Sequence, residues 1–179
     1  TDVNGNAASE TAVVTVEDNV APDVVTQDLT VQLDAGGTAT ITPADIDKGS
    51  ADVCGIGDYA LDISSFSCSD VNNPVTVTLT VTDVNGNAAS ETAVVTVEDN
   101  VAPDVVTQDL TVQLDAGGTA TITPADIDNG SADACGIVDY ALDISSFSCS
   151  DVNNPVMVTL TVTDVNGNAA SETAVVTVE

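Results

Sequence analysis

Residues 75–97 read VTVTLTVTDVNGNAASETAVVTV and carry the clearest structural signal in the chain. From 75 to 81, apolar residues alternate with threonine, which is the period-two pattern of a half-buried β-strand. Residues 92–97 are a second run rich in β-branched residues. Asn85-Gly86 lies between the two runs and is a strong hairpin-turn signal. The stretch therefore predicts two antiparallel strands joined by a tight turn.

Further strands are expected upstream of this hairpin. Residues 29–33, 38–42 and 59–63 alternate in the same way, and residues 43–47 could form one short helical turn. No stretch of useful length has an apolar period of 3.6 residues. Roughly six or seven short strands in about 80 residues predict an all-β fold of the immunoglobulin-like β-sandwich class. An enclosed barrel fits less well, because short acidic loops suit modules stacked end to end.

The chain repeats itself with a period of 81 residues. Residues 1–6, TDVNGN, return at 82–87 and again at 163–168. A polar, turn-prone segment, VEDNVAPD, lies at 16–23 and again at 97–104, and we expect linkers there. This predicts immunoglobulin-like repeats at 18–98 and 99–179, and residues 1–17 as the last strand of a preceding repeat or a strand donated to another chain. Residues 1–81 and 82–162 differ only at Lys48/Asn129, Val53/Ala134, Gly57/Val138 and Thr76/Met157.

The charge balance rules out several classes of function. The chain has 29 Asp and Glu against Lys48 as its only Lys or Arg, and its net charge is −28. Without a basic surface we expect no binding to nucleic acid or to anionic membranes. Without histidine, the commonest general base is missing. No apolar run is long enough for membrane insertion. We therefore expect a non-enzymatic protein.

Three acidic clusters recur in each repeat: one in the linker, one in the loop after the second strand, and one in the hairpin turn. Asp-x-Asp and Asp-x-Asn spacings in tight loops gather oxygen atoms around one point, as Ca²⁺ requires. The candidate Ca²⁺ ligands of the first repeat are Glu17, Asp18, Asn19, Asp23, Asp45, Asp47, Asp52, Asp83, Asn85 and Asn87. Those of the second repeat are Glu98, Asp99, Asn100, Asp104, Asp126, Asp128, Asp133, Asp164, Asn166 and Asn168.

Topology favours bringing these clusters together. In an immunoglobulin-like sandwich, the B–C loop, the F–G hairpin and the incoming chain lie at the same pole. The three clusters are then expected to meet at the junction with the preceding repeat, where a bound cation would offset their repulsion. The alternative is a solvated acidic pole made of ordinary turn residues.

The predicted core is thin, and the cysteines could reinforce it. Cys54 and Cys68 are 14 residues apart, as are Cys135 and Cys149. The simplest pairing is Cys54–Cys68 and Cys135–Cys149, one disulfide in each repeat. Four free thiols, or a metal site made by all four, are the alternatives.

Aromatic residues are too few to suggest a sugar-binding surface. Only Tyr59 and Tyr140 lie suitably in a strand for stacking on a sugar, and we expect both to be core residues.

Two resemblances follow from these motifs. The linker string Asp-Asn-Val-Ala-Pro-Asp resembles the calcium-binding linker of cadherins. The whole unit resembles hyalin-type immunoglobulin-like repeats of bacterial surface and adhesin proteins, through its Asn-Val-Ala-Pro start, residues 133–136, Cys149 and residues 162–168. That family implies an extracellular sandwich in long tandem arrays. This chain departs from it in the last strand, where Glu91 and Ala93 stand in place of a frequent cysteine.

Together these observations predict a structural segment of an extracellular tandem-repeat fibre or cell-surface stalk, with joints rigidified by Ca²⁺. We expect self-association into a filament or long array. The alternative is an adhesin module that binds a glycan or a host or environmental surface through its loops.

Overall fold

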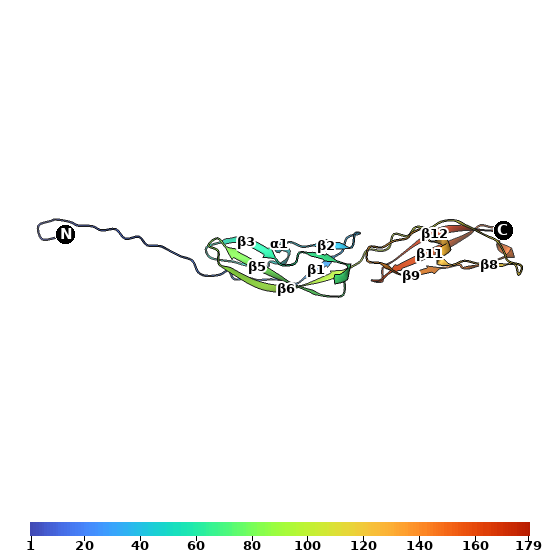
Figure 1. The fold of residues 1–179 in the computed structure, drawn as a ribbon, viewed down its shortest axis with the longest axis horizontal. Coiled ribbons are helices and arrows are strands. Elements are labelled where there is room, and N and C mark those ends of the chain that lie inside the picture. The colour runs from blue at the N-terminus through green and yellow to red at the C-terminus, as the bar shows by residue number, and fades with distance from the viewer.

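The computed structural model describes residues 1–179 and contains two domains arranged end to end after an extended N-terminal segment (Figure 1). The first domain contains β1 (Leu29–Gln32), β2 (Thr38–Thr40), α1 (Pro43–Ile46), β3 (Ile56–Leu61), β4 (Ser65–Ser67), η1 (Cys68–Asp70), β5 (Val75–Asp83) and β6 (Ala88–Glu98). The second contains β7 (Leu110–Val112), β8 (Thr119–Thr121), α2 (Pro124–Ile127), β9 (Ile137–Leu142), β10 (Ser146–Ser148), η2 (Cys149–Asp151), β11 (Val156–Asp164) and β12 (Ala169–Val178).

Each domain is a small β-sandwich. In the first, a four-stranded sheet in the order β1-β6-β5-β3 faces a two-stranded sheet of β2 and β4, and the second domain repeats this arrangement. β1 runs parallel to β6, and the other pairs are antiparallel. The predicted hairpin is β5–β6, and Gly86 in its turn has a positive φ of 95°. The prediction of tandem all-β sandwich domains is confirmed.

The core of each domain follows the alternation read from the sequence. Val77, Leu79 and Val81 of β5 are fully buried, while the threonines between them lie on the opposite face. Ile46 of α1 and Phe66 of β4 complete the core from the other side of the sandwich.

The tyrosines are an exception to the predicted core. Tyr59 and Tyr140 are each 36% exposed. Tyr59 is opposite Val81 in the sheet, but β3 is an edge strand, and Tyr59 lines an open hollow beside α1. The prediction that the tyrosines are core residues is therefore wrong.

Residues 1–17 lie outside both domains and form no strand (Figure 1). Their sequence is identical to residues 82–98 and 163–179. In the two domains those residues form the end of one long strand, the hairpin turn and the next long strand. The pairing of residues 1–17 with a preceding repeat or another chain stays a prediction. No helix of the structure combines the length and the apolar character needed to cross a membrane.

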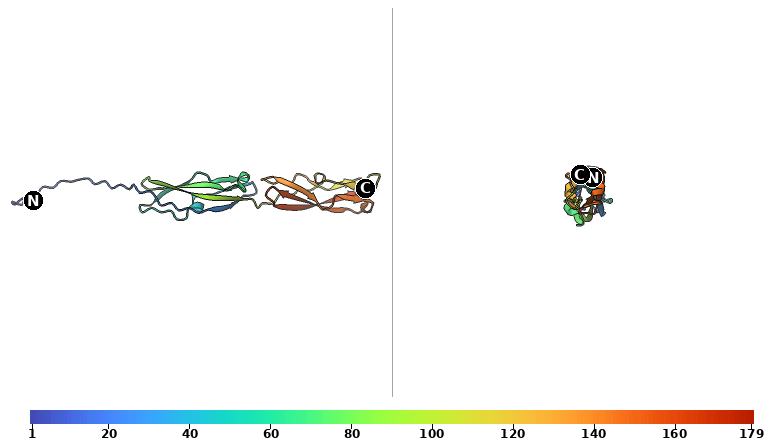
Figure 2. Two further views of the ribbon diagram at one scale, coloured as in Figure 1. Left: turned by 90° about the horizontal axis from the view of Figure 1, so that it is seen from below. Right: turned by 90° about the vertical axis from the view of Figure 1, so that its right-hand side faces the viewer.

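The domains stack in line, and the end-on view shows them one behind the other (Figure 2). We call the end at which the chain enters a domain the leading pole, and the end at which it leaves the trailing pole. The joint consists of the trailing pole of the first domain, the leading pole of the second domain and the linker at residues 98–100 between them.

Candidate metal centre and disulfide at the joint

The linker places one carboxylate inside the joint. Asp99 is only 8% exposed. Its Oδ1 accepts a hydrogen bond from the backbone N–H of Val101 at 3.1 Å, and its Oδ2 is buried without any hydrogen-bond partner. The backbone carbonyl of Asp99 accepts a hydrogen bond from Nδ2 of Asn168 at 3.1 Å. The linker is thus fastened to the hairpin of the second domain, and one carboxylate oxygen is left unsatisfied.

The hairpin turn of the second domain supplies the next groups. Asp164, 1% exposed, accepts hydrogen bonds from the backbone N–H groups of Asn166 and Asn168, both at 2.8 Å, and from Nδ2 of Asn168 at 2.7 Å. These bonds fix the turn and engage both oxygens of Asp164. Asn166 is different, because its Oδ1 is buried and has no hydrogen-bond partner.

A third segment comes from the loop before β9. Oδ1 of Asp133 accepts the backbone N–H of Cys135 at 2.8 Å and of Gly136 at 3.1 Å. Asp133, Asp99 and Cys135 each place one potential ligand atom within 4.8 Å of the others. Cys135 is in a disulfide, so it offers no thiolate, and the donors that remain are oxygens.

Asp99 and Asn166 line a common hollow of about 210 Å³ at the joint. Glu98 and Asn100 of the linker line it too, and the first domain contributes Asn72. No arginine or histidine exists in the chain, and its one lysine is in the loop after α1 of the first domain. An unpartnered buried carboxylate oxygen is energetically costly, and here no cationic side chain is present to offset it. A set of carboxylate and amide oxygens suits a hard cation such as Ca²⁺.

The structure brings together only part of the predicted ligand set. The linker, the hairpin and Asp133 meet at the joint, as described above. Asp126 instead caps α2, where it accepts the N–H and the hydroxyl of Thr123 at 2.7 and 2.8 Å. Asp128 accepts the backbone N–H of Ser131 at 3.0 Å. Asp104 is exposed, and its backbone pairs with Ala132.

The first domain carries the same arrangement at its own leading pole, with no domain in front of it. Nδ2 of Asn87 donates to the carbonyl of Asp18 at 3.1 Å, and Oδ2 of Asp18 is buried without a partner. Asn85 is exposed, whereas its counterpart Asn166 is partly covered by the joint. The other predicted ligands of the first repeat are either exposed or bonded locally. Glu17 and Asn19 are exposed, and the backbone of Asp23 pairs with that of Ala51. Asp45 caps α1, Asp47 and Asp52 accept backbone N–H groups of their own loops, and Asp83 fixes the hairpin turn.

One disulfide crosses the joint. Cys68, at the trailing pole of the first domain, is bonded to Cys135 at the leading pole of the second, with a Cα–Cα distance of 5.2 Å. Cys54 and Cys149 are free and exposed. The predicted pairs Cys54–Cys68 and Cys135–Cys149 are therefore wrong.

The reason for this error is the path of the chain between the cysteines of one repeat. The residues between Cys54 and Cys68 include β3 and β4, which carry the chain from the leading pole to the trailing pole. Fourteen residues of nearly extended chain can span on the order of 40 Å, far beyond disulfide reach. The alternating residues 59–63 between the cysteines were the signal from which this separation could have been inferred.

A glycine makes room for the disulfide. Gly37 has a positive φ of 71°, which favours glycine. A Cβ there would lie 2.6 Å from Sγ of Cys68 and 3.1 Å from Cβ of Ala134 in the second domain.

Side-chain hydrogen bonds also connect β1 to the linker. Gln32 donates to Glu98 at 2.6 Å and accepts from Nδ2 of Asn100.

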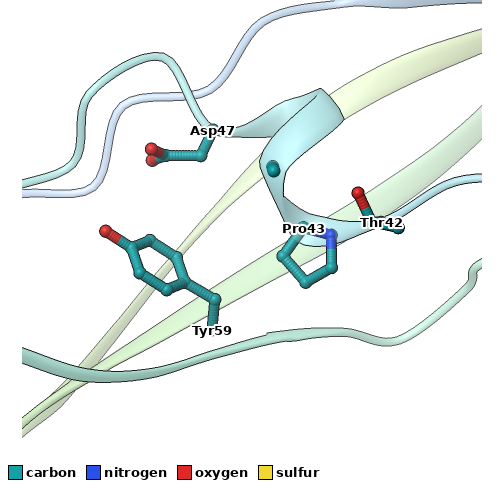
Figure 3. A pocket seen from close by; sticks show the side chains of 5 residues that line it. Thr42, Pro43, Asp47 and Tyr59 are labelled. Atoms are coloured by element: carbon teal, nitrogen blue, oxygen red, sulfur yellow. The ribbon is translucent and has the colours of Figure 1, made fainter.

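A second feature lies away from the joint, beside the exposed tyrosines. Tyr59 lines a hollow of about 410 Å³ together with Thr42, Pro43, Ala44 and Asp47 (Figure 3). The second domain repeats it around Tyr140, with a volume of about 450 Å³. Each hollow joins an aromatic ring to a carboxylate and a hydroxyl.

No family model matches the chain, and no curated protein matches it. The solved structures with a similar arrangement include human mucin-like protocadherin EC1-2, with 14% identity and a TM-score of 0.40, over 88% of this chain and 98% of that one. Human protocadherin-24 EC1-2 has 14% identity and a TM-score of 0.46, over 90% and 99% of the two chains. Drosophila N-cadherin EC1-4 has 15% identity and a TM-score of 0.45, over 89% of this chain and 50% of that one. At these values the likenesses carry no inference about what this chain binds.

The hairpin aspartates lead to a prediction about acid stability. Burial alone would raise the pKa of Asp83 and of Asp164, but hydrogen bonds from the asparagines of the same turn outweigh it, so each pKa lies below its ordinary value of 3.8. A lowered folded-state pKa gives stability that is present above the unfolded-state pKa and is lost as pH falls through the folded-state pKa. With chelator present, the free energy of unfolding should therefore fall as the pH drops below about 4, and it should fall less steeply in D83N/D164N.

The matched control is Asp139→Asn, which removes an exposed carboxylate of β9. Chemical denaturation at a series of pH values measures the slope of the free energy of unfolding against pH for each protein. A D83N/D164N slope equal to that of the wild type and of D139N would contradict the stabilising role of the two hairpin carboxylates.

Proposed function

We propose that this chain is a structural segment of an extracellular tandem-repeat fibre or cell-surface stalk, and that Ca²⁺ stiffens its joints. The observation that carries the proposal is that Asp99 and Asn166, which line one hollow at the joint, each have a buried side-chain oxygen without a hydrogen-bond partner. The chain has a net charge of −28, so its own side chains supply almost no positive charge to offset these oxygens.

The donor set supports Ca²⁺ over other cations. Asp99 and Asn166, which line the hollow, would hold the ion together with Asp133, whose carboxylate lies within 4.8 Å of that of Asp99. Glu98 and Asn100 line the hollow too. Ca²⁺ accepts about 6–8 oxygen ligands in flexible geometry, which suits side chains from three separate segments. Mg²⁺ demands a near-ideal octahedron, and zinc favours sulfur and nitrogen donors that are missing here.

The mechanical consequence follows from where these segments come from. The linker joins the two domains, whereas Asp133 and Asn166 belong to two different loops of the second domain. A cation held by all three would fix the direction in which the linker enters the second domain. The disulfide between Cys68 and Cys135 adds a second, covalent connection, so the joint cannot swivel freely about the linker alone.

The covalent connection also supports the proposed location. Disulfides persist in oxidising compartments, such as the cell exterior, and are rare where thiols are kept reduced. An acidic, cation-dependent rod built from nearly identical units suits a surface stalk or a filament. The bacterial setting implied by the hyalin-type resemblance stays a prediction.

The calcium proposal is tested by thermal melting with and without Ca²⁺. A ligand at about one hundred times its Kd adds about 2.7 kcal/mol to the folded state. We expect the wild type to melt several degrees higher in Ca²⁺ than in chelator, and Asp99→Asn to lose most of this shift, because the amide removes the unpartnered negative charge.

Asp18→Asn is the matched control, since it makes the same change at the leading pole that no domain covers. Asp18→Asn should retain the calcium-dependent rise in melting temperature that we assign to the joint. A wild-type shift of less than a degree, or a full shift in D99N, would overturn the proposal. Small-angle scattering of C68S/C135S, which lacks the covalent connection, should show a longer maximum dimension in Ca²⁺ than in chelator.

An adhesin module that binds a glycan is the second candidate, and the exposed tyrosines favour it. Each ring stands in a hollow with a carboxylate and a hydroxyl, repeated once per domain (Figure 3). Aromatic faces with a few polar groups are the usual lining of small-ligand sites.

This candidate predicts that Y59A/Y140A loses glycan binding on an array by up to roughly tenfold, because a lost aromatic contact costs about 0.5–1.5 kcal/mol. Y59F/Y140F keeps the ring and should stay close to the wild type. Absence of any glycan signal for the wild type, or equal binding by the alanine variant, would rule this candidate out.

A further inference from the structure

The two exposed cysteines occupy the repeat positions that are bonded inside the molecule. Cys54 is the counterpart of Cys135, and Cys149 is the counterpart of Cys68, each 81 residues along the chain. The bonded pair lies at the internal joint, and the free pair lies at the two outer poles. Each outer pole therefore carries one of the two cysteine positions that are joined at the inner joint.

The outer trailing pole has the same local geometry as the inner one. Sγ of Cys149 lies 3.7 Å from the carbonyl oxygen of Gly118, and Sγ of Cys68 lies 3.7 Å from that of Gly37. A Cβ on Gly118 would be 2.8 Å from Sγ of Cys149, and the corresponding distance at the inner joint, from Gly37 to Cys68, is 2.6 Å. Gln113 bonds to Glu179 at 2.7 Å, as Gln32 bonds to Glu98. The free thiol thus sits in the same setting as its bonded counterpart.

The outer leading pole matches the inner one as well. One potential ligand atom each of Cys54, Asp18 and Asp52 lies within 4.8 Å of the others, and the same holds for Cys135, Asp99 and Asp133. The backbone N–H of Cys54 donates to Asp52 at 2.7 Å, and that of Cys135 donates to Asp133 at 2.8 Å. The exposed Val53 differs, because Ala134 takes its place at the inner joint.

We propose that the trailing pole of one copy of this chain docks on the leading pole of a second copy, and that a disulfide between Cys149 of the first and Cys54 of the second locks the contact. The inner joint, where the corresponding surfaces already meet, is the template for this contact, with residues 1–17 of the second copy leading into its leading pole as β6 leads into the inner joint. Cys54 precedes β3 at the leading pole of the first domain, and Cys149 begins η2 at the trailing pole of the second, so the two cysteines of one chain cannot bond to each other. The two domains lie end to end between these poles (Figure 1). The inference rests on the proposed fibre function, and it names the chemistry by which such a fibre extends; it does not require Ca²⁺.

The bond forms by thiol–disulfide exchange with a small disulfide such as oxidised glutathione. The thiolate of one cysteine attacks the small disulfide, forms a mixed disulfide and releases one glutathione thiolate. The second cysteine thiolate then attacks the protein sulfur of the mixed disulfide and releases the other. Two protein thiols are oxidised, one small disulfide is reduced to two thiols, and the two protons pass to the released thiolates or to water.

The test uses two single variants of the full chain, C54S and C149S, in a glutathione redox buffer. C54S keeps the thiol of the trailing pole, and C149S keeps the thiol of the leading pole. We expect wild type to give a ladder on a non-reducing gel, each variant alone to stay monomeric, and an equimolar mixture to give a dimer that grows no further. Peptide mapping of that dimer should find Cys149 bonded to Cys54.

A mixture that stays monomeric overturns the inference, as does a single variant that dimerises as readily as the mixture. Running the same mixture in Ca²⁺ and in chelator separates this result from the calcium proposal. A mixed dimer without any calcium-dependent shift in melting supports the covalent contact and overturns only the calcium joint. A calcium-dependent shift without a mixed dimer overturns only the covalent contact.

Discussion

The chain crosses each domain from pole to pole, and this constraint governs the chemistry of the molecule. Since the incoming and outgoing segments lie at opposite ends, a group at one pole faces the neighbouring repeat and never the far pole of its own domain. The cysteines illustrate this, because β3 and β4 hold Cys54 and Cys68 at opposite ends of one sandwich. A repeat of this kind completes its covalent bonds only with a neighbour.

The same constraint divides the acidic residues into two groups. Many aspartate carboxylates accept hydrogen bonds from backbone N–H groups of their own turns. Asp34, for example, accepts from Gly36 and Thr38 at 2.9 and 3.0 Å. These carboxylates shape loops. Asp99 belongs to the other group, because its Oδ2 is buried without a hydrogen-bond partner, and Asp18 repeats this at the leading pole of the first domain. We therefore propose that the need for a cation lies at the leading poles, where these oxygens are buried, and not along the whole rod.

Much of the fold could be predicted from the sequence because alternation and turn residues act locally. The β5–β6 hairpin, the 81-residue period and the buried face of β5 all follow from residues 75–97 and their copies. The short β4 was missed, since Ser-Phe-Ser is too brief to show a period. Tyr59 was misplaced because alternation indicates which face of a strand is apolar, but not that β3 is an edge strand.

The candidate site was harder to predict because it depends on which loops share a pole. Asp126 and Asp128 have the spacing of metal ligands, yet Asp126 lies within α2 and caps its start, and Asp128 follows α2 and bonds to its own loop. Asp133, only a few residues later, reaches the joint. Asn166 was among the predicted ligands, and what the sequence could not indicate is that its Oδ1 is buried without a hydrogen-bond partner while Asn85 of the first repeat is exposed. Disulfide pairing was misjudged for the related reason that separation along the sequence does not reveal separation between poles.

The most direct measurement of this account is disulfide mapping of the monomeric wild-type chain, alkylated before digestion under non-reducing conditions. The account predicts a peptide pair joined through Cys68 and Cys135, with Cys54 and Cys149 both alkylated. A bond between Cys54 and Cys68, or between Cys135 and Cys149, would place both cysteines of one repeat within reach of each other and would contradict the joint between repeats.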